Sequence, residues 1–96
     1  MKVVALSDTH GYHDRVEVPQ GDVLIHAGDF SRMGTVEEIK DFDRWLGTLP
    51  HAHKLIIAGN HDILFEQSPE EAQALLTNGT YLQDSGVTIG CHKFWG

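Results

Sequence analysis

Three short apolar runs, each followed at once by acidic, imidazole or amide side chains, constrain the fold of this chain most. Residues 3–6 lead into Ser7-Asp8-Thr9-His10, residues 23–27 into Gly28-Asp29, and residues 55–58 into Gly59-Asn60-His61-Asp62. Short apolar runs of this kind are typical of buried strands. In an open α/β sheet, ligands bind outside the carboxyl ends of parallel strands. Convergence of the three strand ends would therefore bring carboxylate, imidazole and amide groups to one point.

A helical segment between the second and third runs predicts how these strands are connected. Thr35-Val36-Glu37-Glu38 is a capping-box start. Apolar residues then recur at helical spacing, namely Ile39, Phe42, Leu46 and Leu49. Gly47 and Pro50 end the helix. Because a strand–helix–strand order implies a right-handed crossover between parallel strands, the sequence predicts an α/β fold with a mostly parallel sheet and crossover helices.

The last third of the chain predicts smaller elements. Ser68-Pro69-Glu70-Glu71 starts a second helix with a serine N-cap and a proline in its first turn. Asn78-Gly79 is expected to stop this helix in the left-handed conformation. Residues 81–82 are a short strand, and residues 87–90 and 93–95 form a final hairpin or edge strand. No linker or repeat divides the chain, so residues 1–96 are expected to form a single domain.

Charge and composition narrow the class of function. The formal net charge of −7 is spread along the chain, which argues against a basic nucleic-acid-binding surface and is compatible with bound divalent cations. A single cysteine, Cys91, excludes an internal disulfide and a thiolate metal site. No apolar run is long enough to span a bilayer, and the first strand follows directly on Met1. We therefore expect a cytoplasmic protein without membrane partners.

The three strand-end stretches together carry the chemistry. In extended backbone the side chains of Asp8 and His10 point the same way, so both can reach one ion. Asp29 adds a carboxylate after a glycine that permits a tight turn. Asn60 and His61 add an amide oxygen and a titratable imidazole. Mixed oxygen and nitrogen ligands of this kind suit hard to borderline divalent ions.

The order and spacing of these blocks closely resemble the first three signature blocks of the calcineurin-like metallophosphoesterases. The flanking stretches are most similar to small cyclic-nucleotide-type phosphodiesterases and vertebrate metallophosphoesterase-domain proteins: His26-Ala27-Gly28-Asp29-Phe30, Trp45-Leu46-Gly47 and Phe94-Trp95-Gly96. The resemblance covers essentially the whole chain. It implies a phosphoesterase, in particular a phosphodiesterase acting on nucleotides or small phosphate esters.

The resemblance also implies a role for each residue of the blocks. Asp8 and His10 would bind a first divalent ion, Asp29 would bridge two ions, and Asn60 would bind the second. The ions, which could be Mn, Fe, Zn, Ni or Mg, would lie roughly 4 Å apart and bind the oxygens of the phosphate. His61 would donate to the scissile phosphate and assist the leaving oxygen, while Asp62 would orient His61.

One departure from the family pattern leaves two functions open. Members of the family continue well beyond this point with a further strand-end histidine and a Gly-His-x-His block, and Gly90-Cys91-His92-Lys93 is not that block. The resemblance therefore implies about half of a four-layer α/β/β/α sandwich, with the amino-terminal metal ligands only. The alternative to an enzyme is a truncated, non-catalytic half-domain that associates with itself or a partner chain and binds metal weakly or not at all.

Other polar and aromatic residues have simpler interpretations. Four histidines outside the blocks are expected to be solvated or half-buried: His13, His51, His53 and His92. His26 lies inside a strand and is expected to be a hydrogen-bonded core residue close enough to Asp29 to support it. Asp41 and Asp43 are assigned to the solvated helix face, Phe42 and Trp45 to packing, and Trp95 to covering an exposed part of the core.

Overall fold

The computed structural model describes residues 1–96, with the exception of the side chain of Asp14. A four-stranded parallel sheet has the order β1 (Val3–Leu6), β2 (Val23–His26), β3 (His53–Ile56) and β4 (Thr80–Tyr81). An antiparallel hairpin consists of β5 (Gly86–Ile89) and β6 (His92–Trp95). The helices are α1 (Val36–Gly47), α2 (Ile63–Gln67) and α3 (Pro69–Leu75), with a 3-10 turn at His13–Arg15. The predicted α/β fold with a mostly parallel sheet is confirmed.

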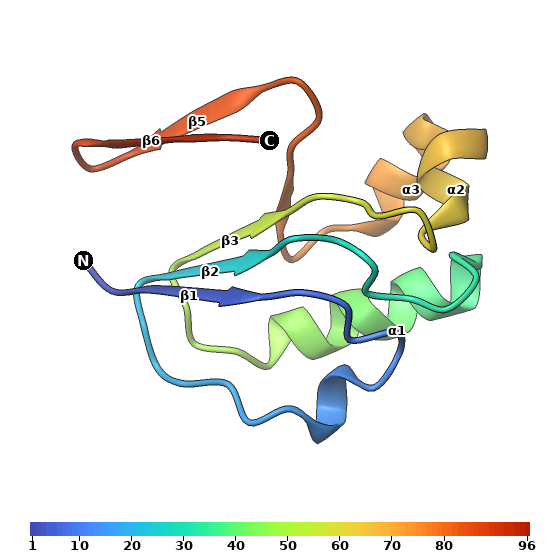
Figure 1. Ribbon diagram of the computed structural model, residues 1–96, viewed down its shortest axis with the longest axis horizontal. Helices are drawn as coiled ribbons and strands as arrows, with labels where there is room; N and C mark the ends of the chain where they lie inside the picture. The colour runs from blue at the N-terminus through green and yellow to red at the C-terminus, as the bar shows by residue number, and fades with distance from the viewer.

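The register of the sheet aligns the ends of its first three strands. Leu6 lies opposite His26, and His26 lies opposite Ile56. Figure 1 shows β1, β2 and β3 running in the same direction, so that the loops after them and the start of α1 meet at the same end of the molecule. The parallel topology alone therefore gathers the three polar stretches.

The two faces of the sheet are covered by different elements, because successive side chains of a strand point to opposite faces. Val4, Leu24 and Ile56 pack with Ile39, Phe42 and Leu46 of α1. Val23 and Leu55 lie on the other face, with Val87, Ile89 and Phe94 of the hairpin packed there. In Figure 1, α1 lies below β1–β3 and the β5–β6 hairpin lies above them.

Helix α1 begins as the capping box predicts. Thr35 Oγ1 accepts a hydrogen bond from the Glu38 backbone N–H at 3.2 Å. The Glu38 carboxylate, however, accepts from the backbone N–H groups of Arg32 and Met33, at 2.7 and 3.1 Å. It therefore ties the loop after β2 to the first turn of the helix. Phe30, in the same loop, also packs on the helix in the core, where its ring stacks on Phe42 with centroids 4.2 Å apart.

Asp43 differs from its assignment to the solvated helix face. Asp43 is only 8% exposed, and its carboxylate accepts hydrogen bonds from the Thr77 hydroxyl at 2.8 Å and from the Asn78 backbone N–H at 2.7 Å. The predicted left-handed stop at Asn78-Gly79 is also wrong, because α3 ends at Leu75 and Gly79 does not have a positive φ. The carboxylate of a neighbouring helix, and not a local stop signal, holds this loop.

Three further expectations change in the folded chain. His13 and His51 are buried, at 3% and 4% exposure. The ring of His13 packs against Phe42 and Trp45 of α1, and His51 Nε2 lies 2.9 Å from the Pro19 carbonyl oxygen. Trp95 is 69% exposed and does not cover the core. The short helix α2 was not predicted, since its five residues give too few turns to show a period. Among the described residues, we find no helix with the length and apolar character needed to cross a membrane.

Candidate metal centre

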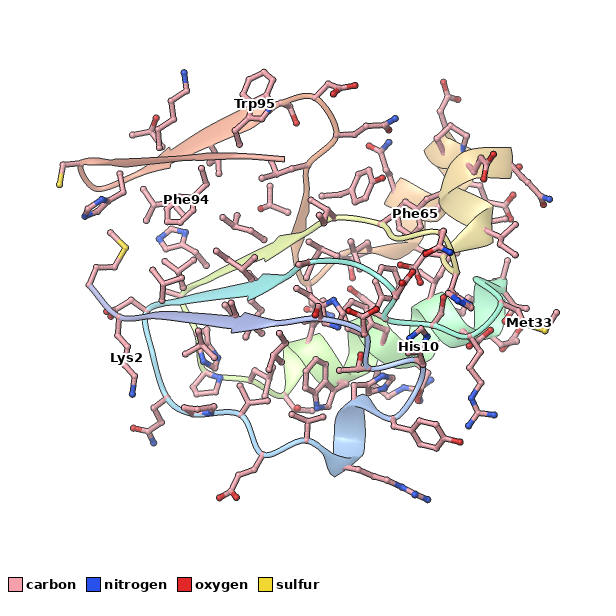
Figure 2. All side chains as sticks on the ribbon, viewed as in Figure 1. Lys2, His10, Met33, Phe65, Phe94 and Trp95 are labelled. Atoms are coloured by element: carbon pink, nitrogen blue, oxygen red, sulfur yellow. The ribbon has the colours of Figure 1, made fainter. Side chains whose placement is uncertain are left out.

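Three of the sequence-predicted metal ligands meet beyond the ends of β1 and β2. Asp8, His10 and Asp29 each offer a ligand atom, and these atoms all lie within 4.8 Å of one another. His10 Nε2 lies 3.7 Å from Asp8 Oδ1. Figure 2 labels His10 at the end of the molecule where the strand loops converge. The arrangement is that of a partial coordination sphere built from two carboxylates and one imidazole.

The backbone at these residues is held in an uncommon conformation. Asp8, His10 and Asp29 have positive φ values of 55°, 45° and 57°. A non-glycine residue in this region costs on the order of 1 kcal/mol or more, and such strain gathers at functional sites. Backbone hydrogen bonds stabilise it here, from Asp8 N to Gly28 O and from His10 N to Asp29 O, each 3.0 Å long. The loops after β1 and β2 therefore fix one another.

Glycines allow the loops after β2 and β3 to approach closely. A Cβ atom at Gly59 would overlap the carboxylate of Asp29. Gly28 has a φ of 107°, and a Cβ there would press on the backbone of Gly59. Glycine is required at both positions, because any side chain would push the candidate ligand Asp29 away from the third strand end.

Asn60 joins the cluster through Asp29. Its amide oxygen position lies 3.2 and 3.1 Å from the two carboxylate oxygens of Asp29, and rotation of the amide would turn these contacts into hydrogen bonds from its nitrogen. Either orientation of the amide places the Asn60 side chain against the Asp29 carboxylate. The donor set of Asp8, His10, Asp29 and Asn60 fits a divalent ion.

His61 lies beside His10 of the cluster, and a backbone carbonyl holds its ring. The ring centroids of His61 and His10 are 4.8 Å apart in an edge arrangement. His61 Nδ1 lies 3.1 Å from the carbonyl oxygen of Arg32. Since a carbonyl only accepts hydrogen bonds, Nδ1 carries the proton, and Nε2 remains for a ligand. The His61 backbone N–H also donates to Asp29 Oδ1 at 2.9 Å.

Asp62 contacts the loops and not the ring of His61, which differs from the expected orienting contact. Its carboxylate is 1% exposed and accepts from the backbone N–H groups of Asp29, Ser31 and Gly59, at 2.8, 3.0 and 2.9 Å. The Ser31 hydroxyl donates to it at 2.5 Å. The physical reason is that unpaired backbone N–H groups gather where the two loops meet. Asp62 therefore positions Asp29 and His61 through the main chain.

His26 supports the site from inside the sheet. Its Nδ1 accepts from the Gly28 backbone N–H at 3.2 Å, so Nε2 carries the proton and donates to Thr9 Oγ1 at 2.9 Å. Desolvation by burial lowers the pKa of His26 to about 4, against the favourable influence of nearby carboxylates. The ring is neutral near pH 7 and links the residue between Asp8 and His10 to the turn before Asp29.

The candidate ligand Asp8 is exposed and ionised. A hydrogen bond from the Ser7 side chain lowers the pKa of its carboxyl group most, while desolvation opposes this shift. A charged carboxylate is the form that binds a cation. Asp8 is therefore ready to coordinate metal at neutral pH.

The site contains all the residues predicted from the sequence and two that were not predicted. The predicted residues Asp8, His10, Asp29, Asn60, His61 and Asp62 all lie in this one cluster or in the loops that form it. Ser31 and Arg32 were not singled out, because their contributions to Asp62 and His61 come from a hydroxyl and a backbone carbonyl, which carry no sequence pattern.

Comparison with known proteins gives consistent matches. The family model described as calcineurin-like phosphoesterase matches residues 1–93. The human metallophosphoesterase domain-containing protein 1 is 41% identical over 99% of this chain, which corresponds to 36% of that protein. A UPF0046 protein of Caenorhabditis elegans is 44% identical over the whole chain and 38% of its own length. The chain therefore spans less than two fifths of these relatives.

Proposed function

Because the chain belongs to the calcineurin-like phosphoesterase family, we propose that it takes part in metal-dependent hydrolysis of phosphate esters, with phosphodiesters of nucleotides or other small molecules as substrates. The observation that carries this proposal is the convergence of Asp8, His10 and Asp29 at one point beside Asn60 and His61. We further propose that Asp8, His10, Asp29 and Asn60 would hold two divalent ions. When bound, such ions polarise the phosphate and activate water.

The residues of the chain itself supply orientation and a proton site. Asp29 is fixed on both sides, by the His61 backbone N–H on its carboxylate and by Asp62 on its own backbone N–H. His61 donates its Nδ1 proton to the Arg32 carbonyl, so Nε2 is the ring nitrogen left for a substrate. When the imidazole is protonated, Nε2–H can donate to a phosphate oxygen or to the leaving oxygen. This assigns hydrogen-bond donation to His61 and positioning to Asp62.

Hydrolysis of bis(p-nitrophenyl) phosphate with Mn²⁺ tests the proposal. We expect Asp29→Ala and His61→Ala to reduce kcat/KM by at least about 100-fold, as loss of a metal ligand or an acid–base group does. Glu70→Gln on the exposed face of α3 is the matched control and should leave the rate unchanged. Activity that survives in both site variants would assign the reaction to a contaminant or another site.

A second candidate function is a non-catalytic half-domain that associates with itself or with a partner chain. It is favoured by the sheet face over β1, where Val3 remains 45% exposed although the hairpin covers Val23 and Leu55. In this function the ligands of the chain would bind metal weakly, because affinity depends on ligand number and geometry.

Light scattering and metal titration on the same sample distinguish the two functions. A monomer that binds Mn²⁺ and turns over substrate supports the enzyme. An oligomer that neither retains metal nor hydrolyses the ester supports the half-domain.

A further inference from the structure

Two arginines share one aromatic ring beside the metal cluster. The guanidinium carbon of Arg32 lies 4.5 Å from the ring centroid of Tyr12, and that of Arg15 lies 5.1 Å from the same centroid. Both distances are within the range of cation–π contacts. Tyr12 is 45% exposed and both arginines are exposed, so the three side chains form a solvent-facing surface. We name Tyr12, Arg15 and Arg32 the arginine platform.

The arginine platform is anchored to the candidate metal ligands. Arg32 Nε donates to the carbonyl oxygen of His10 at 3.3 Å, and the Arg32 carbonyl accepts from His61 Nδ1 at 3.1 Å. Arg32 therefore touches both histidines of the cluster. The guanidinium is therefore held next to the main chain of a candidate metal ligand.

The carboxylates near the platform are engaged elsewhere. Glu38 accepts from the backbone N–H groups of Arg32 and Met33, and Asp41 pairs with His13 and Arg44. Among the side chains that the structure describes, no carboxylate lies within ion-pair distance of Arg15 or Arg32. In a chain with a net charge of −7, two cations on one ring without such a partner form a local positive site.

A hollow of about 420 Å³ next to Arg32 is lined by Gly11, His13, Arg32 and Met33, and by three acidic residues of α1, Glu37, Glu38 and Asp41. Because these carboxylates repel an anion, a phosphate would meet Arg32 on the exposed surface that it shares with Tyr12 and Arg15 and not in the hollow. Figure 2 labels Met33 and His10 at this same end of the molecule. A planar guanidinium binds phosphate oxygens in pairs, which makes arginine the side chain best suited to recognise a phosphate here.

We propose that the arginine platform binds a second phosphate group of the substrate, separate from the phosphate that reacts at the metal cluster. The substrate class is then a phosphate ester that carries an additional phosphate, such as a nucleoside bisphosphate, an oligonucleotide end or a sugar bisphosphate. This inference rests on the proposed function for the position of the reacting phosphate. To the proposed function, the inference adds a second negatively charged group on the substrate.

Binding of two nucleotides that differ by one phosphate tests the inference without turnover. Thymidine 3′,5′-bisphosphate and thymidine 5′-monophosphate are titrated calorimetrically into the chain in the presence of Mn²⁺. We expect the bisphosphate to bind about tenfold more tightly, as a charge-assisted hydrogen bond provides. Arg32→Gln should bring the ratio of the two affinities close to one. Arg44→Gln, which removes an exposed arginine on α1 outside the platform, should preserve the ratio.

The outcomes separate this inference from the proposed function. Equal affinities in the unaltered chain, or an unchanged ratio in Arg32→Gln, overturn the platform even if the ester is hydrolysed. A tenfold ratio that Arg32→Gln abolishes supports the platform even if no hydrolysis is found. If neither nucleotide binds, both the platform and the phosphate site at the cluster are wrong.

Discussion

Two buried carboxylates hold loops at opposite ends of the sheet, and both do so by accepting hydrogen bonds from backbone N–H and hydroxyl groups. Asp62 lies beyond the carboxyl end of β3 and accepts from four backbone N–H groups and the Ser31 hydroxyl. Asp43 of α1 accepts from the Asn78 backbone N–H, the Asn78 amide and the Thr77 hydroxyl before β4. The difference is what the bound loop carries, because only the Asp62 loops include candidate metal ligands. The two carboxylates therefore differ in the loops that they hold and not in the kind of hydrogen bond that they accept.

Removal of each carboxylate is the strongest way to break this comparison. Asp62→Ala leaves several buried donors without partners, at about 1–3 kcal/mol each, so we expect a loss of about 4 kcal/mol in the free energy of unfolding. Asp43→Ala, with a less buried set of donors, should lose about 2 kcal/mol. Urea denaturation measures both losses. Titration with Mn²⁺ at a temperature where both variants are folded should show weaker binding for Asp62→Ala only, and an equal loss of affinity in Asp43→Ala would remove the distinction.

Acid should lower the free energy of unfolding through His26, which lies at the carboxyl end of β2. Its pKa is about 4 in the folded chain and about 6.5 when unfolded, so the unfolded state takes up the proton first as the pH falls. The stability that its neutral ring contributes is complete above pH 6.5 and is lost between about pH 6.5 and 4, to a total of about 3 kcal/mol. Unfolding curves across this range measure the slope. His26→Gln should abolish that part of the slope, and the exposed control His53→Gln should not.

Close approach of the loops after β2 and β3 gives a third, smaller effect. Gly59→Ala places a methyl group against the Asp29 carboxylate, and we expect overpacking to cost about 2 kcal/mol of stability. The larger change should be in metal affinity, because Asp29 has to move. A variant that binds Mn²⁺ as tightly as the unaltered chain would show that the site does not depend on this contact.

Removal of one hydroxyl donor from each carboxylate is expected to have the smallest effect. Ser31→Ala removes one donor from Asp62, and Thr77→Val removes one donor from Asp43. Each should cost about 1 kcal/mol of unfolding free energy. Only Ser31→Ala should also reduce the affinity for Mn²⁺ by about tenfold, because outer partners of metal sites tune their ligands. Matched changes in both variants would place the Ser31 hydroxyl outside the metal site.

Much of the fold could be predicted from local pattern. The apolar runs that become β1, β2 and β3, the capping box of α1 and the proline at the start of α3 are short-range signals, and the structure agrees with them. The prediction failed where a distant partner decides the outcome. Helix α3 ends at Leu75 and not at Asn78-Gly79, and the segment that follows is held by Asp43, which is 35 residues from Asn78 in the sequence.

The sequence by itself determined which residues gather at the candidate metal site. Strand ends carry Asp8, His10, Asp29 and Asn60, and parallel strands in register bring their ends together whatever the details of packing. Only the tertiary structure decided how these residues are held. Asp62 binds the loops, and the Arg32 carbonyl holds His61, because these contacts use backbone groups from residues about thirty positions apart in the chain. Backbone donors and acceptors are the same in every residue, so no sequence pattern marks them.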